Sequence, residues 1–71
     1  MDLFEIDDTQ RLTREQAAAR LHALADALAR HNEVEFERGG ARITVDVPDE
    51  VNLKIEVELG DESELEIELT W

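Results

Sequence analysis

The chain has 71 residues, of which 19 are acidic and 7 are basic, so its formal net charge is −12 at pH 7. A chain of this length forms a single domain that buries only about 60% of its unfolded surface, and disulfides, metals or oligomerisation often supplement so small a core. The absence of cysteine excludes disulfides and thiolate metal sites, two histidines are too few for a closed zinc site, and the acidity opposes binding to nucleic acid or to anionic membranes.

The first part of the chain is predicted to form a short strand and then a helix. The strand is expected within residues 1–8, from the apolar residues Leu3, Phe4 and Ile6. The helix is expected to begin after Thr13, whose hydroxyl can cap the first turn while the side chain of Gln16 reaches back to it. It is expected to run to about His31, because no glycine or proline interrupts it.

Two faces of this helix carry different side chains. Apolar residues at spacings of three and four form a ridge, which consists of Ala17, Leu21, Leu24 and Leu28. Beside the ridge lies a smooth alanine flank, which consists of Ala18, Ala25 and Ala29. The ridge is expected to pack on a sheet, and the flank leaves room for the close approach of a second element.

A first hairpin is predicted after the helix. Residues 33–38 and 41–47 each alternate apolar and polar side chains, which is the pattern of strands with one buried face. Gly39-Gly40 between them predicts a two-residue turn. That turn places Val34 opposite Val45 and Phe36 opposite Ile43, so apolar residues meet on one face.

A second hairpin is predicted in the last third of the chain. Residues 51–59 and 64–71 alternate strictly, and the loop between them must be effectively odd, three or five residues long, to keep the apolar sides together. The apolar side carries Val51, Leu53, Ile55, Val57, Leu59, Leu65, Ile67, Leu69 and Trp71. The other side is almost entirely glutamate, so like charges are expected directly opposite each other, which is destabilising.

The predicted fold class is α+β, in one domain that spans residues 1–71. A three-residue turn at 48–50 would place Val45 opposite Leu53 and join the two hairpins into a four-stranded antiparallel meander. The expected architecture is therefore a short N-terminal strand, one amphipathic helix, and this meander with the helix on one face. The N-terminal strand could lie beside the last strand, beside the strand that follows the helix, or across a dimer.

This order of elements resembles the amphi-Trp domain family, whose members are small and mostly haloarchaeal proteins. The resemblance is carried by Leu12-Thr13-Arg14-Glu15-Gln16, the helix through Leu28, the Gly39-Gly40 turn, Val45-Asp46-Val47-Pro48, and the segment 66–71 with its terminal Trp71. It covers nearly the whole chain. The family has no assigned biochemical activity, so the resemblance implies no functional residue for this chain.

No catalytic, metal or cofactor site is predicted. The many carboxylates lie on a flat, solvated strand face, whereas acid–base catalysis needs two carboxylates at a defined separation in a desolvated cleft. His22 and Asp26 stand one helical turn apart and could hold a metal weakly, but an exposed helix back is the expectation. Acidic residues near the last loop (Asp61, Glu62 and Glu64) lack the oxygen spacing of an EF-hand. We therefore expect a non-enzymatic protein without a cofactor.

A homodimer is predicted from the width of the sheet. A helix about 10 Å across covers about two strands that are spaced about 4.8 Å apart, which leaves the other half of the apolar face wet. A symmetric dimer would cover it. The candidate dimer or partner interface consists of Ala18, Ala25, Ala29, Leu65, Ile67, Leu69 and Trp71. For Trp71, packing in a core or an interface is expected, and a ligand-stacking platform is the alternative.

Two functions are compatible with these features. The first is a homodimeric protein-interaction or adaptor module with an unknown protein partner. The second is an acidic mimic of nucleic acid that binds a basic protein. Abundant acid with Lys54 as the single lysine is typical of a salt-rich cytoplasm, where screening relieves carboxylate repulsion. No apolar run is long enough for a secretion signal or a membrane span, so we expect a soluble, cytoplasmic protein.

Overall fold

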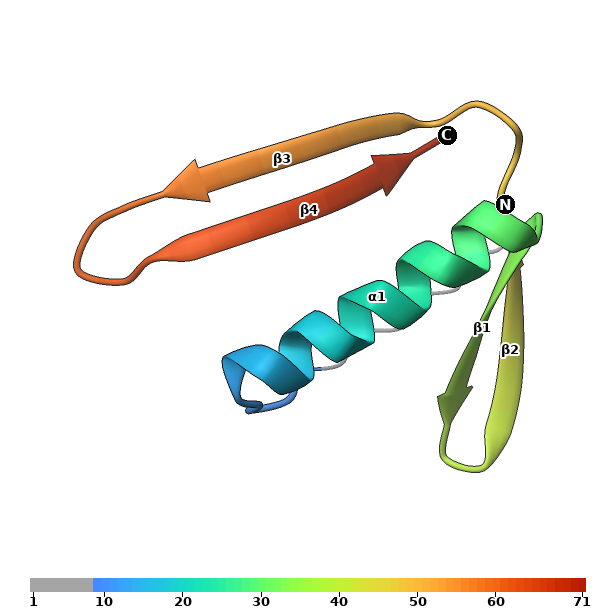
Figure 1. The fold of residues 1–71 in the computed structure, drawn as a ribbon, viewed down its shortest axis with the longest axis horizontal. Helices are drawn as coiled ribbons and strands as arrows, with labels where there is room; N and C mark the ends of the chain where they lie inside the picture. Colours follow the sequence, from blue (N-terminus) through green and yellow to red (C-terminus); the bar gives the residue numbers. More distant parts are fainter. Residues whose placement is uncertain (1–8) are drawn as a thin grey trace.

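A computed structural model describes residues 9–71 of the chain (Figure 1). Within these residues the chain forms one helix and four strands, in the order α1 (Arg14–Arg30), β1 (Glu33–Arg38), β2 (Ala41–Asp46), β3 (Asn52–Glu58) and β4 (Glu64–Thr70). The predicted α+β class and the predicted order from the helix onward are confirmed. The predicted N-terminal strand lies outside the described residues.

Helix α1 begins with the predicted capping box. The Thr13 hydroxyl oxygen accepts a hydrogen bond from the Gln16 backbone N–H at 3.1 Å, and the Gln16 side-chain oxygen accepts one from the Thr13 backbone N–H at 3.0 Å. These two bonds satisfy backbone donors that the first turn of a helix leaves free. The helix ends at Arg30, and the C-cap residue His31 has an extended backbone whose N–H still donates to the Ala27 carbonyl at 2.9 Å.

Removal of the Thr13 hydroxyl should weaken α1 measurably. We expect Thr13→Ala to lower the free energy of unfolding by about 1 kcal/mol, because the N–H of Gln16 loses its acceptor. Thr13→Ser keeps the hydroxyl oxygen and is the matched control, which should stay close to the wild type. Urea unfolding followed by far-ultraviolet circular dichroism measures both, and equal stability of the two variants would contradict a role for the capping box.

The β1–β2 hairpin closes as its sequence predicts. Gly39 and Gly40 both have positive φ, at 57° and 81°, which is the backbone of a type I′ turn and is strained for residues with a side chain. The register pairs Val34 with Val45 and Phe36 with Ile43, as predicted. Apolar side chains therefore share one face of this hairpin.

The β3–β4 hairpin also has the predicted parity. Leu53 pairs with Leu69 and Ile55 with Ile67, and the loop at 59–63 is five residues long, one of the two lengths that the alternation allows. The other face carries Glu56 directly opposite Glu66. Both local registers thus follow from alternation and turn length.

The predicted four-stranded meander is wrong for residues 9–71. β2 and β3 do not pair, and the strands form two separate two-stranded sheets. The Val47 N–H donates to the Asn32 carbonyl at 2.7 Å, which extends the β1–β2 ladder by one more residue. Pro48 follows, and because it lacks an N–H and has a fixed φ, the ladder ends there. The connector at 47–51 then leads β3 away instead of turning it back along β2 (Figure 1).

Few side chains of the described residues are buried in a core. Helix α1 packs against β1, where Val34, only 7% exposed, is the single buried apolar side chain among residues 9–71. Leu24, Ala27 and Leu28 of the helix are half-buried, and Leu24 and Ala27 line the same space as Val34. Within the described residues the β3–β4 hairpin packs on neither α1 nor the first hairpin, and in Figure 1 it lies on the other side of α1 from β1 and β2. Helix coverage of one face therefore holds for the first hairpin alone.

Candidate interaction surfaces

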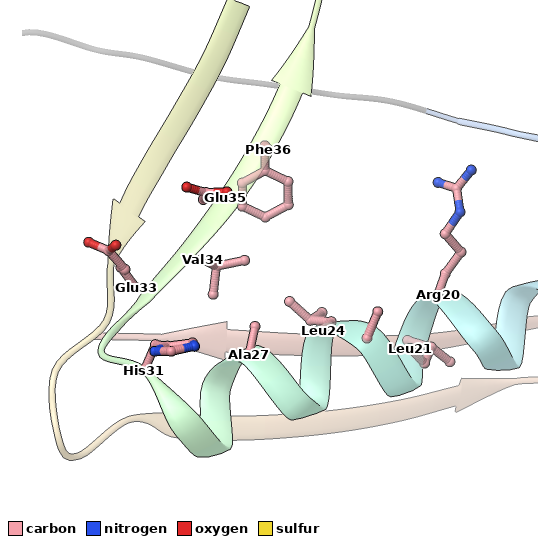
Figure 2. Close-up of a pocket in the computed structure, with 10 residues that line it drawn as sticks. Arg20, Leu21, Leu24, Ala27, His31, Glu33, Val34, Glu35 and Phe36 are labelled. Carbon is pink, nitrogen blue, oxygen red and sulfur yellow. The ribbon is translucent and has the colours of Figure 1, made fainter.

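An open apolar groove lies between the helix and the first strand. α1 and β1 diverge from their junction at His31 and leave a space of about 710 Å³ (Figure 2). We call this the α1–β1 groove, and its apolar lining consists of Leu21, Ala23, Leu24, Ala27, Val34 and Phe36. Figure 2 shows Leu24 and Ala27 directed from the helix toward Val34 on the strand. Polar side chains border it, which are Arg20, His31, Glu33 and Glu35.

The helical and the strand periodicity of the sequence bring the apolar side chains of this groove together. Side chains three or four residues apart share one face of a helix, which brings Leu21 and Leu24 together. Alternate residues of a strand share one face, which brings Val34 and Phe36 together. Because the two elements diverge, the narrow end of the groove buries Val34, whereas Leu21 and Phe36 at the wide end remain exposed.

The second apolar surface is one side of the β3–β4 hairpin. We call it the hairpin face, and it consists of Leu53, Ile55, Val57, Leu65, Ile67 and Leu69. Five of these side chains are between 49% and 65% exposed, and Leu69 is half-buried. Trp71, which follows β4 with the same parity, is 60% exposed. Soluble monomers rarely leave a contiguous apolar surface of this kind uncovered.

The opposite side of the same hairpin is strongly acidic. Glu56 lies directly opposite Glu66, and Glu58 lies directly opposite Glu64. The Lys54 ammonium lies 3.2 Å from the Glu56 carboxylate and is exposed, so this ion pair contributes little. The hairpin is therefore a thin layer with one apolar side and one anionic side.

The predicted interface residues fall into two groups in the structure. Leu65, Ile67 and Leu69 lie together on the hairpin face, with Trp71 next to its end. Ala18, Ala25 and Ala29 are exposed on the flank of α1 that faces away from the Ala23 and Ala27 side of the groove. The structure of a single chain does not bring the two groups together.

Sequence reasoning missed the α1–β1 groove. Leu21 and Leu24 were expected under the sheet, but the partly open space beside Phe36 was not expected, and Ala23 and Ala27 were not singled out. The signal was present in the helix, because Ala27 follows Leu24 at a spacing of three and lies on the same side. The divergence of α1 from β1 has no local signature in the sequence.

The described residues offer little chemistry of other kinds. Among residues 9–71 no three histidine, aspartate or glutamate side chains come close enough to hold a metal ion. His22 and Asp26 are both exposed on α1. In this part of the chain, no helix has the length and apolar character that crossing a bilayer requires.

Comparisons with known proteins point to one family. The sequence model of the family described as the Amphi-Trp domain matches residues 2–71, which is essentially the whole chain. No curated protein and no solved structure matches the chain.

Proposed function

This chain belongs to the Amphi-Trp domain family, and from its two uncovered apolar surfaces we propose that it works as a homodimeric protein-interaction module. In this proposal the protein is an adaptor without catalytic activity, cofactor or bound metal. The contact between the two copies buries their apolar surfaces and so forms the core, and surfaces outside that contact bind a protein partner. The predicted interface residues on the hairpin face, with Trp71, belong to the contact between copies.

The observation that carries this proposal is the amount of uncovered surface. A compact chain of 8.1 kDa exposes about 4,500 Å², whereas this chain exposes 6965 Å². Even if residues 1–8 exposed the full area of an unfolded segment, they would contribute only about 1,300 Å² of this difference. At least about 1,000 Å² per chain remains, and a standard interface takes about 800 Å² from each partner.

The instability of isolated hairpins also supports a dimer. A two-stranded sheet is marginally stable in water unless a third element covers its apolar face. Here β3 and β4 form an ordered ladder of seven residue pairs while the hairpin face stays exposed. A second copy of the same chain supplies the missing cover, and closed two-fold symmetry limits the assembly to a dimer.

We place this module in a salt-rich cytoplasm. The chain carries a net charge of −12 with Lys54 as its single lysine, and the acidic side of the β3–β4 hairpin sets glutamates directly opposite each other. Charges of one sign destabilise a compact state by self-repulsion. At 1 M salt the screening length is about 3 Å, so the repulsion across the hairpin is largely removed.

A nucleic-acid mimic is the alternative function. The observation that favours it is the column of glutamates on β3 and β4, because a dense and ordered set of carboxylates can occupy a basic protein surface that otherwise binds phosphates. This proposal needs the charges themselves, whereas the dimer of the adaptor proposal needs the apolar surfaces. The adaptor is preferred because the salt-rich solvent already accounts for the acidity.

Mass measurement in molar salt tests the adaptor proposal. Multi-angle light scattering should give twice the chain mass of 8.1 kDa at micromolar concentration, and a pull-down from native cells at native salt should recover a partner at a defined stoichiometry. A mass of one chain at every concentration would contradict the dimer. A partner retained equally by a variant with a disrupted hairpin face would contradict binding through the dimer.

A further inference from the structure

We propose that the dimer forms by reciprocal exchange of the β3–β4 hairpin, so that the hairpin face of each copy fills the α1–β1 groove of the other. This inference rests on the dimer of the proposed function and specifies which surfaces meet. It commits the groove to one occupant, the second copy of this chain. It also assigns the connector at 47–51 the role of the hinge between the exchanged parts.

The two surfaces suit each other in size and in chemistry. The groove is lined by aliphatic side chains and Phe36, and its volume of about 710 Å³ has room for between about four and five groups the size of benzene, which fills a cavity of about 150 Å³. The hairpin face presents six aliphatic side chains on one side of a thin layer. When that side enters the groove, the glutamates of the other side stay in water, where charged groups avoid a desolvation cost.

A second copy of this chain is favoured as the occupant of the groove because the contact between two copies is reciprocal. If residues 1–8 or an unrelated protein filled the groove, the hairpin face would still be exposed. Exchange covers both surfaces of both chains with one kind of contact and closes the assembly at two copies, whereas a one-way contact would build a larger ring or a filament. The area left uncovered in a single chain is also that of a stable interface.

The connector decides between exchange and closure within one chain. The hydrogen bond from Val47 to Asn32 and the fixed φ of Pro48 orient the start of the connector. Five residues span at most about 18 Å, and the connector bends at Asp49 but forms no hydrogen-bonded turn that would set β3 back along β2. Closure onto the same chain needs that turn, but exchange needs no change of the connector. Short hinges of this kind favour exchange.

Engineered cysteines test the contact, because the natural chain has none. Phe36→Cys lies in the groove and Ile67→Cys lies at the centre of the hairpin face. After the two single variants are mixed in molar salt and oxidised, a disulfide between the two different chains should predominate over either self-linked product. Thr44→Cys mixed with Glu66→Cys, at exposed positions outside the groove and the hairpin face, is the matched control and should give at least tenfold less product.

The double variant F36C/I67C separates exchange from closure. Exchange yields a covalent dimer with two interchain disulfides, whereas closure yields a monomer with one internal disulfide, which would overturn the exchange. Predominant self-linking of Ile67→Cys would also overturn it while leaving the dimer of the proposed function intact. A light-scattering mass of one chain before oxidation would instead contradict the proposed function, and the exchange with it.

A longer hinge gives an independent test. Insertion of five Gly and Ser residues between Pro48 and Asp49 allows the hairpin to return to its own groove. We expect the dissociation constant of the dimer to rise at least tenfold while the circular dichroism spectrum stays that of the wild type. A dissociation constant unchanged by the insertion would overturn the exchange, because a dimer of two fully closed chains does not depend on the hinge.

Discussion

Ile67→Asp is expected to convert the proposed dimer into monomers and to produce the largest effect of any single substitution on the hairpin. Ile67 pairs with Ile55 at the middle of the hairpin face. The variant loses the burial of one aliphatic side chain and places a carboxylate in an apolar contact. We expect the dissociation constant to rise by about a hundredfold, which corresponds to about 3 kcal/mol. Light scattering over a concentration series in molar salt measures it.

Thr70→Asp is the matched control for this substitution. It adds the same charge to the same strand, but Thr70 pairs with Asn52 on the other side of the hairpin. Its dissociation constant should stay within a few fold of the wild-type value. If the two variants dissociated equally, the effect would arise from net charge, and the hairpin face would not be the contact.

Salt is expected to stabilise the folded protein strongly. Between 0.1 M and 2 M potassium chloride we expect the free energy of unfolding to rise by about 2 kcal/mol, since the two directly opposed glutamate pairs of the β3–β4 hairpin each cost up to about 1 kcal/mol when unscreened. Urea unfolding at a series of salt concentrations measures this rise. A free energy that does not change with salt would contradict the assignment of the acidic side to a salt-rich solvent.

Two neutralising substitutions distinguish the repulsion between directly opposed glutamates from the effect of the overall net charge. Glu66→Gln removes a repulsion with Glu56 and should stabilise the protein at low salt, while reducing its salt dependence. Glu37→Gln removes the same charge but lies opposite Arg42, so it should give no such gain. Equal effects of the two substitutions would mean that net charge alone sets the salt dependence.

The same acidic side distinguishes the two candidate functions. If the protein mimics nucleic acid, the double variant Glu56→Gln/Glu66→Gln should compete less well than the wild type with DNA for a basic protein. Equal competition by the variant and the wild type would contradict mimicry. The adaptor proposal expects the double variant to bind its partner and to dimerise as the wild type does.

The local elements of this fold could be predicted because short-range chemistry determines them. The start of α1 depends on Thr13 and Gln16, which are three residues apart and bond to each other. The first hairpin depends on Gly39-Gly40, whose positive φ angles close the turn and set Val34 opposite Val45. Strict alternation set the register of the second hairpin. The resemblance to the amphi-Trp domain rested on the same elements, and the match over residues 2–71 confirms it.

The pairing of the two hairpins could not be predicted in the same way. Alternation permits Val45 to face Leu53 but does not require it, because a strand edge pairs with any edge of suitable parity. The outcome depends on the connector at 47–51, where the Val47–Asn32 hydrogen bond and Pro48 direct the chain away from β2. That hydrogen bond joins the residue after β2 to the residue before β1, and no sequence pattern encodes it.

By itself, the sequence determined a capped helix, two hairpins with their registers, and a β3–β4 hairpin with an apolar side that something must cover. Only the tertiary structure decided that α1 packs on β1, that it leaves an open groove beside Phe36, and that it does not reach β3 and β4. The physical reason is the range of the interactions. Turns, caps and alternation act over a few residues, whereas burial is non-directional and accepts any apolar partner, so the path of the chain in three dimensions decides which apolar surfaces meet.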